Sequence, residues 1–147
     1  MSENLEEPKF KLIQEYERFE VRQYMDTIQA RVASYSAKDE KSRIHFRQIA
    51  SYIFGNNNKR EEISMTAPVH MWKEKNKKFM AFTMPSKYNL KELPKPNDNN
   101  VQLLNVKGDI VAVLKFSWFA GQSKTRKLIK ELQNLIEIEN LRVKGTP

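Results

Sequence analysis

Residues 27–55 read TIQARVASYSAKDEKSRIHFRQIASYIFG, and this stretch predicts a strand followed by a helix. Its first part, from Thr27 to Tyr35, alternates between two kinds of side chain, which is the period-2 pattern of a half-buried strand. One face of this strand carries Ile28, Ala30, Val32 and Ser34, and the other carries Gln29, Arg31 and Ala33.

The second part of the stretch has the signals of an amphipathic helix. Ser36 is a candidate N-cap with Asp39 in the first turn, and Gly55 stands where a C′ glycine ends a helix. Between these ends, one helix face carries Phe46, Ile49, Ala50 and Ile53. Asn56, Asn57 and Asn58 form the expected exit loop.

The rest of the chain predicts further strands and one more helix. A short extended piece and five strands are expected at Phe10–Ile13, Phe19–Tyr24, Ile63–Trp72, Phe79–Met84, Val101–Val106 and Ile110–Trp118, the last two joined by Gly108–Asp109. Pro68 cannot donate to a strand ladder, so it indicates an edge or a bulge in the Ile63–Trp72 strand. Ser123 is expected to cap a helix whose apolar stripe is Leu128, Ile129, Leu132, Leu135 and Ile136, with a short extended piece at Leu141–Val143. This order predicts an α+β fold with two helices on a curved antiparallel sheet, built from a repeated unit whose second copy is shorter.

Length and composition predict one domain over residues 1–147, with residues 1–9 expected to be disordered. The chain has no cysteine, which excludes disulfides, thiolate catalysis and Cys-ligated metal sites. Its N-terminus lacks a signal peptide and its apolar runs are too short for a membrane span, so a soluble, cytoplasmic protein is expected.

The net charge of +8 favours anionic partners, but the charges are not gathered into one block. Lys73, Lys75, Lys77 and Lys78 fall in a predicted hairpin, where solvated lysines are common. The aromatic residues Phe79 and Phe82 fit a strand buried on both sides better than a stacking platform for single-stranded nucleic acid. No specific nucleic-acid binding is therefore expected.

The catalytic inventory is small, and a non-enzymatic protein is expected. His45 and His70 are the two histidines, and neither has a metal-ligand or triad spacing. His45 is either an axial ligand to a porphyrin iron or, preferred here, a boundary residue with its tip in water. His70 is expected to face outward from its strand.

Several segments resemble the SOUL haem-binding protein family. They run in order along the chain: Phe46–Gly55, Ile63-Ser-Met-Thr-Ala-Pro-Val69, Phe82–Tyr88, Leu93–Pro96 followed by Val101, and Phe116–Gly121. The resemblance implies a distorted antiparallel β-barrel flanked by two helices with a pseudo-twofold repeat, similar to gyrase-inhibitor-like effector-binding domains. It also implies reversible binding of haem or another tetrapyrrole in an apolar groove beside the first helix.

Carried over by position, the resemblance assigns four residues of the first helix to this groove. Arg43 and Arg47 would lie at its rim, where a guanidinium can pair with a propionate, and Phe46 and Ala50 would contact the macrocycle. A solvated helix flank for the two arginines and core packing for Phe46 are equally open. The alternative is a protein-interaction or small-molecule effector-sensing domain of the same fold that binds no haem.

The chain departs from the family pattern in two places. Phe46 and Ala50 stand where some haem-binding members have methionine. The family's C-terminal segment, which forms a further strand, is absent after Gly145-Thr146-Pro147. A missing last strand would expose a sheet edge and permit self-association.

Overall fold

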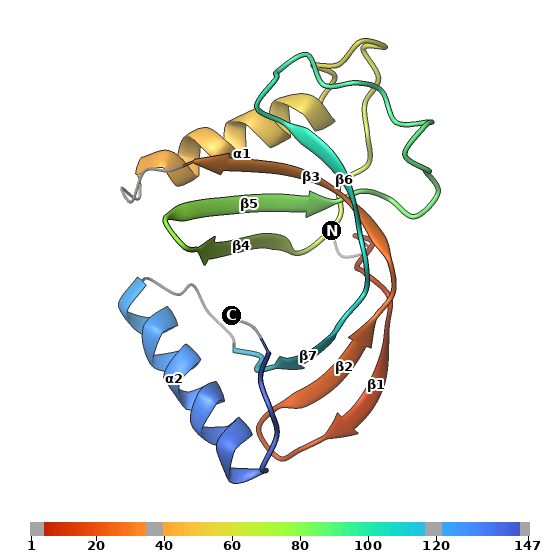
Figure 1. The fold of residues 1–147 in the computed structure, drawn as a ribbon. Helices are drawn as coiled ribbons and strands as arrows, with labels where there is room; N and C mark the ends of the chain where they lie inside the picture. Colours follow the sequence, from red (N-terminus) through yellow and green to blue (C-terminus); the bar gives the residue numbers. More distant parts are fainter. Residues whose placement is uncertain (1–4, 35–39, 117–121, 145–147) are drawn as a thin grey trace. The chain divides into compact units, whose positions relative to one another are not determined.

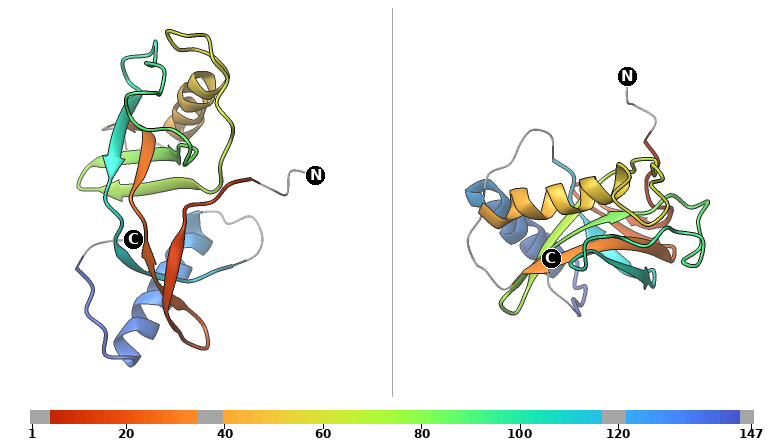
Figure 2. Two further views of the ribbon diagram at one scale, coloured as in Figure 1. Left: turned by 90° about the vertical axis from the view of Figure 1, so that its right-hand side faces the viewer. Right: turned by 90° about the horizontal axis from the view of Figure 1, so that it is seen from above.

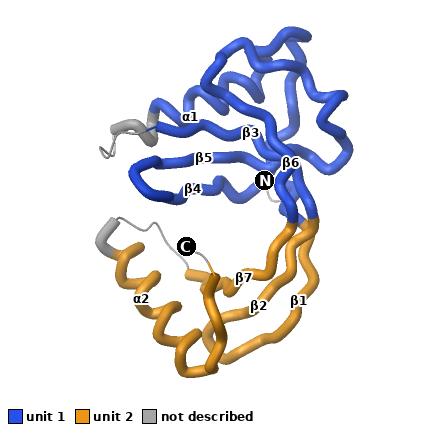
Figure 3. The backbone as a smooth tube through the Cα atoms, viewed as in Figure 1, with its two compact units in different colours: residues 1–8, 26–107 blue, residues 9–25, 108–147 orange. Residues whose placement is uncertain are grey.

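The computed structural model describes residues 5–34, 40–116 and 122–144 (Figure 1). The chain divides into two compact units (Figure 3). Unit 1 consists of Met1–Pro8 and Asp26–Lys107, and unit 2 consists of Lys9–Met25 and Gly108–Pro147.

Unit 1 contains a four-stranded antiparallel sheet and one helix. The strand order is β4-β5-β3-β6, with β3 at Thr27–Ser34, β4 at Val69–Glu74, β5 at Lys77–Thr83 and β6 at Gln102–Val106. The helix α1 (Glu40–Ile53) packs against β3 and β5 and lies along one face of the sheet (Figure 2). Its apolar face and the strand side chains beneath it form the core, which includes Ala30, Val32, Ile49, Tyr52, Ile53, Met80 and Phe82.

Local signals set the end of α1. Gly55 has a φ of 117°. Its amide donates to the Tyr52 carbonyl, and the Asn56 amide donates to the Ser51 carbonyl. These two hydrogen bonds form a Schellman cap. Asn57, buried at 1% exposure, then donates from Nδ2 to the carbonyls of Tyr52 and Glu61. The C′ role predicted for Gly55 is confirmed, and Asn57 anchors the exit loop to the helix.

Unit 2 contains a three-stranded antiparallel sheet and the second helix. The strand order is β1-β2-β7, with β1 at Phe10–Glu15, β2 at Glu20–Tyr24, β7 at Ile110–Val113 and the helix α2 at Gln122–Ile138. The predicted apolar stripe of α2 is confirmed, since Ile136 is buried and Leu128, Ile129, Leu132 and Leu135 are half-buried.

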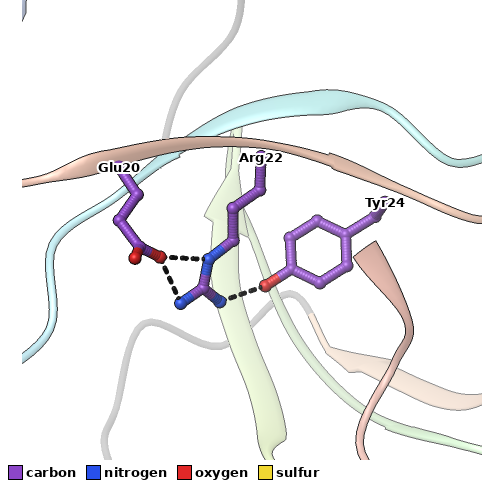
Figure 4. A network of polar contacts seen from close by, with 3 residues as sticks. All are labelled: Glu20, Arg22 and Tyr24. Carbon is purple, nitrogen blue, oxygen red and sulfur yellow. Dashed lines mark hydrogen bonds and ion pairs between the residues drawn. The ribbon is translucent and has the colours of Figure 1, made fainter. Parts of the chain in front are cut away.

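A buried arginine lies in the unit 2 sheet. Arg22 is surrounded by its own neighbours on β2: Glu20 Oε1 accepts hydrogen bonds at 2.6 Å, and Nη1 donates to Tyr24 Oη at 2.7 Å (Figure 4). Its guanidinium also lies 4.0 Å from the centre of the Phe10 ring. Burial acts to lower the Arg22 pKa, but the bonds to Tyr24 and Glu20 outweigh it and raise the pKa.

Several expected boundaries are wrong. The strand predicted for Ile63–Trp72 begins only at Val69, because Pro68 has no amide to donate and the chain pairs with β5 only after it. The strand predicted for Ile110–Trp118 ends at Val113, and Leu141–Val143 forms no strand within the described residues. The expected cap Ser123 lies inside α2, and Ser36 lies outside the described residues.

The α+β class with two helices and antiparallel sheets is confirmed. β6 and β7 are joined through Gly108–Asp109 but belong to different sheets. The closed barrel, the pseudo-twofold repeat and the single domain remain predictions.

In the segment expected to be disordered, Glu6 forms a parallel bridge with Thr66 and its carboxylate accepts a bond from the Ser86 amide.

Candidate functional site

The site residues predicted on α1 can be placed individually. Phe46 is 43% exposed, and its ring meets the buried ring of Phe82 edge-on at a centroid distance of 5.9 Å. Ala50 follows one turn later and is half-buried, while Arg47 is exposed. Arg43 lies in the first turn of α1, and its side chain is outside the described part of the structure. Phe46 therefore presents an apolar ring to solvent beside the sheet.

The strand β4 supplies a second exposed apolar surface on the same face of the sheet. Val69 pairs with Phe82 and Met71 pairs with Met80, so both side chains lie on the face that α1 covers over β5. Among the described residues α1 does not pack against β4, and Met71 is 60% exposed. We name Phe46, Val69 and Met71, with Phe82 beneath them, the apolar strip.

Two lysines lie at one end of the apolar strip. Lys73 pairs with Lys78 in the next same-face rung after Met71 and Met80. This end of the sheet is the β4–β5 hairpin, and α1 begins at the same end (Figures 1 and 2). The sequence predicted these lysines as ordinary hairpin residues, and their alternation with Val69 and Met71 was the signal that could have linked them to a site.

The two histidines do not occupy the predicted environments. His45 is 5% exposed, so the preferred interpretation as a boundary residue with a solvated tip is wrong. His70 is half-buried on the sheet face opposite the apolar strip, with Nε2 3.2 Å from Thr83 Oγ1. His70 faces away from α1, but it is half-buried, and this burial lowers its pKa below the usual 6.5.

The described residues contain no cluster of three or more His, Asp or Glu side chains that could hold a metal ion. An open cavity of about 480 Å³ lies in unit 2, lined by Arg18, Lys127, Lys130, Glu131, Asn134, Leu135 and Ile138. Arg18 and Glu131 form an ion pair within it. In the described part of the chain, neither helix has the length and apolar character to cross a membrane.

Comparison with known proteins bears on nearly the whole chain. The model of the family described as SOUL heme-binding protein matches residues 5–147. No curated protein matches the chain. The match includes α1, β4 and the hairpin lysines, and haem binding is the property for which the family is named. The chain belongs to the SOUL haem-binding protein family.

Proposed function

We propose that this protein is a non-enzymatic carrier that binds haem or a related tetrapyrrole reversibly along the apolar strip. The observation that carries the proposal is the strip itself: exposed Phe46 contacts buried Phe82, exposed Val69 and Met71 follow on the same sheet face, and Lys73 and Lys78 lie at one end. Family membership supports haem as the ligand.

The chemistry of these residues fits the two parts of a tetrapyrrole. The macrocycle is flat and apolar, and Phe46, Val69 and Met71 offer aromatic, branched and polarizable surface. The propionates are anionic, and Lys73, Lys78 and Arg47 can pair with them, as can Arg43 on the first turn of α1. Ala50 has no side chain beyond Cβ and leaves room beside Phe46.

Apolar burial accounts for most of the expected affinity. Covering one exposed aromatic side chain contributes about 1.5–3 kcal/mol, whereas an exposed ion pair contributes at most about 1 kcal/mol. The lysines and arginines therefore contribute more to the orientation of the ligand than to its affinity. We assign no axial ligand to the haem iron, because the side chain of His45 is only 5% exposed.

Haemin titration followed by the Soret band tests the proposal. We expect stoichiometric binding by the unsubstituted chain. Phe46→Asp and Met71→Asp should each raise the Kd at least about tenfold, because each places a carboxylate where the macrocycle would lie. His45→Ala should lower stability but leave the Soret maximum unchanged.

Matched controls are available in unit 2. Phe116 is 50% exposed and Met25 is 58% exposed, close to the values for Phe46 and Met71. Phe116→Asp and Met25→Asp should bind haemin like the unsubstituted chain. If all four variants bind equally, the placement is wrong, and if the unsubstituted chain does not bind, the function is wrong.

The second candidate is an effector-sensing or protein-interaction domain without haem. The open cavity of unit 2 favours it, since Lys127, Lys130 and Arg18 give this cavity a positive lining with one acidic residue. Purified protein that stays colourless and gains no Soret band with micromolar haemin would favour this candidate. Self-association through a sheet edge and a cytoplasmic location remain predictions.

A further inference from the structure

The sheet of unit 1 carries a second, different surface on the face opposite the apolar strip. Arg31 on β3 and His70 on β4 both pair with Ala81 of β5, so the three side chains form one rung of this face. Ala81 is fully buried and small, which leaves room for the Arg31 side chain to lie across β5.

The guanidinium of Arg31 rests on an aromatic pair. Its Cζ lies 4.9 Å from the centre of the Trp72 ring and 6.0 Å from that of Phe79. The two rings are stacked with a centroid distance of 5.0 Å and an interplanar angle of 8°. Both aromatic residues are half-buried. We name Arg31, Gln29, Trp72 and Phe79 the Arg31 cluster.

Among the described residues, Arg31 has no anionic partner of the kind that a desolvated arginine normally has. Its Nη2 donates to Gln29 Oε1 at 2.8 Å, and this is its one hydrogen bond within the described residues. In the described part of the chain, the buried Nε of Arg31 has no hydrogen-bond partner and no carboxylate forms an ion pair with the guanidinium. Burial lowers the Arg31 pKa, with a smaller opposing effect of the Glu74 charge.

Arg22, the buried arginine of unit 2, differs from Arg31 in having hydrogen-bond partners for its donors. Arg22 also lies on an aromatic ring, but Glu20 and Tyr24 satisfy its donors. A buried donor without a partner is unfavourable, and such groups in folded proteins call for an explanation such as a bound ion or ligand. Arg31 has donors, charge and a flat apolar support, and residues 5–34, 40–116 and 122–144 supply no anionic acceptor for it.

We propose that the Arg31 cluster is a binding site for a small aromatic carboxylate. The carboxylate would accept hydrogen bonds from the Arg31 guanidinium, and the ring would lie against the exposed parts of Trp72 and Phe79. The site lies on the opposite sheet face from the apolar strip, so it does not depend on haem binding.

Trp72 provides a direct optical probe of the site. The chain has two tryptophans, and Trp118→Phe leaves Trp72 as the single emitter. Benzoate, neutral benzamide and cationic benzylammonium share one ring and differ in charge. In the Trp118→Phe background we expect saturable quenching by benzoate, with a Kd at least about tenfold below those of the other two probes.

Substitution of Arg31 completes the test. Arg31→Gln should raise the benzoate Kd at least about tenfold, and Arg31→Lys should raise it less, because lysine keeps the charge but not the planar fork. Arg142→Gln, which removes an exposed arginine of unit 2, should leave the Kd unchanged. Circular dichroism checks that each variant is folded.

Two results would overturn the proposal. One is quenching that is linear and equal for the three probes, which indicates collision alone. The other is saturable benzoate binding that a folded Arg31→Gln variant retains. If Arg31→Gln does not fold, the comparison of the three probes on the Trp118→Phe chain still decides, because only an anion receptor separates benzoate from benzamide.

Discussion

At the scale of single residues, burial decides the chemistry of His70. Its imidazole lies beside Thr83 Oγ1 at 3.2 Å, and burial lowers its pKa from 6.5. In the pH range between the lowered folded pKa and 6.5, the unfolded chain binds the proton more tightly than the folded chain. His70 therefore stabilises the fold above about pH 6.5, and this contribution is lost as the pH falls through the folded pKa.

This linkage gives a testable prediction. We expect the free energy of unfolding to fall between about pH 7.5 and about pH 5.5, and to fall less in His70→Gln, which keeps a hydrogen-bonding group but does not titrate there. Urea unfolding of both proteins at the two pH values measures the difference, and the remaining titratable groups are common to both. An identical pH dependence in the two proteins would show that His70 is equally solvated in both states.

At the scale of elements, two glycines stabilise the protein for different reasons. Gly55 ends α1 with a φ of 117°, and a Cβ there would meet no atom closer than 3.9 Å. Gly108 precedes β7, and a Cβ there would overlap the backbone carbonyl of Tyr24. The first position requires glycine for its backbone conformation, and the second requires it for space.

The two alanine variants should differ accordingly. Gly55→Ala should cost about 1 kcal/mol, the usual penalty for a left-handed conformation, while Gly108→Ala should cost about 2–3 kcal/mol, because the backbone itself must move. Urea unfolding measures both costs. Equal losses would mean that the strand pairing near Tyr24 moves aside more easily than the close contact implies.

At the scale of the whole molecule, the buried apolar residues are divided unequally. Of the described residues, Phe19 and Ile136 are the buried apolar side chains of unit 2, whereas the core cluster around Ile49 and Phe82 belongs to unit 1. A unit of fewer than about 60 residues with so little core is marginal on its own. The chain also passes between the units three times, after Pro8, Met25 and Lys107.

We therefore expect the two units to unfold in one cooperative transition, as the single-domain prediction requires. In the Trp118→Phe chain, tryptophan fluorescence reports Trp72 in unit 1 alone, and its thermal transition should coincide with that of far-ultraviolet circular dichroism, which reports both helices. Gly55→Ala and Gly108→Ala lie in different units, and each should shift both signals together. Gly108→Ala that shifts the circular dichroism transition but leaves the Trp72 fluorescence midpoint unchanged would show two independent domains.

The sequence by itself determined the local elements. Period-2 alternation located β3 and β5, the 3.6-residue period located both helices, and Gly55 marked the end of α1, because these signals depend on neighbours along the chain. It also determined the family, since the ordered segments from Phe46 to Gly121 are a property of the chain alone. Phe46 and Ala50 were expected on an accessible helix face, and Phe46 is exposed there.

Tertiary structure alone decided what surrounds each residue. Val69 and Met71 join Phe46 because α1 covers β3 and β5 but leaves the described face of β4 open, and Lys73 and Lys78 meet through strand register. Contacts between distant segments also bury His45 and place the Arg31 side chain across Ala81 against Trp72. Which strand face a helix covers, and which residues share a rung, depend on contacts between distant segments that no local period encodes.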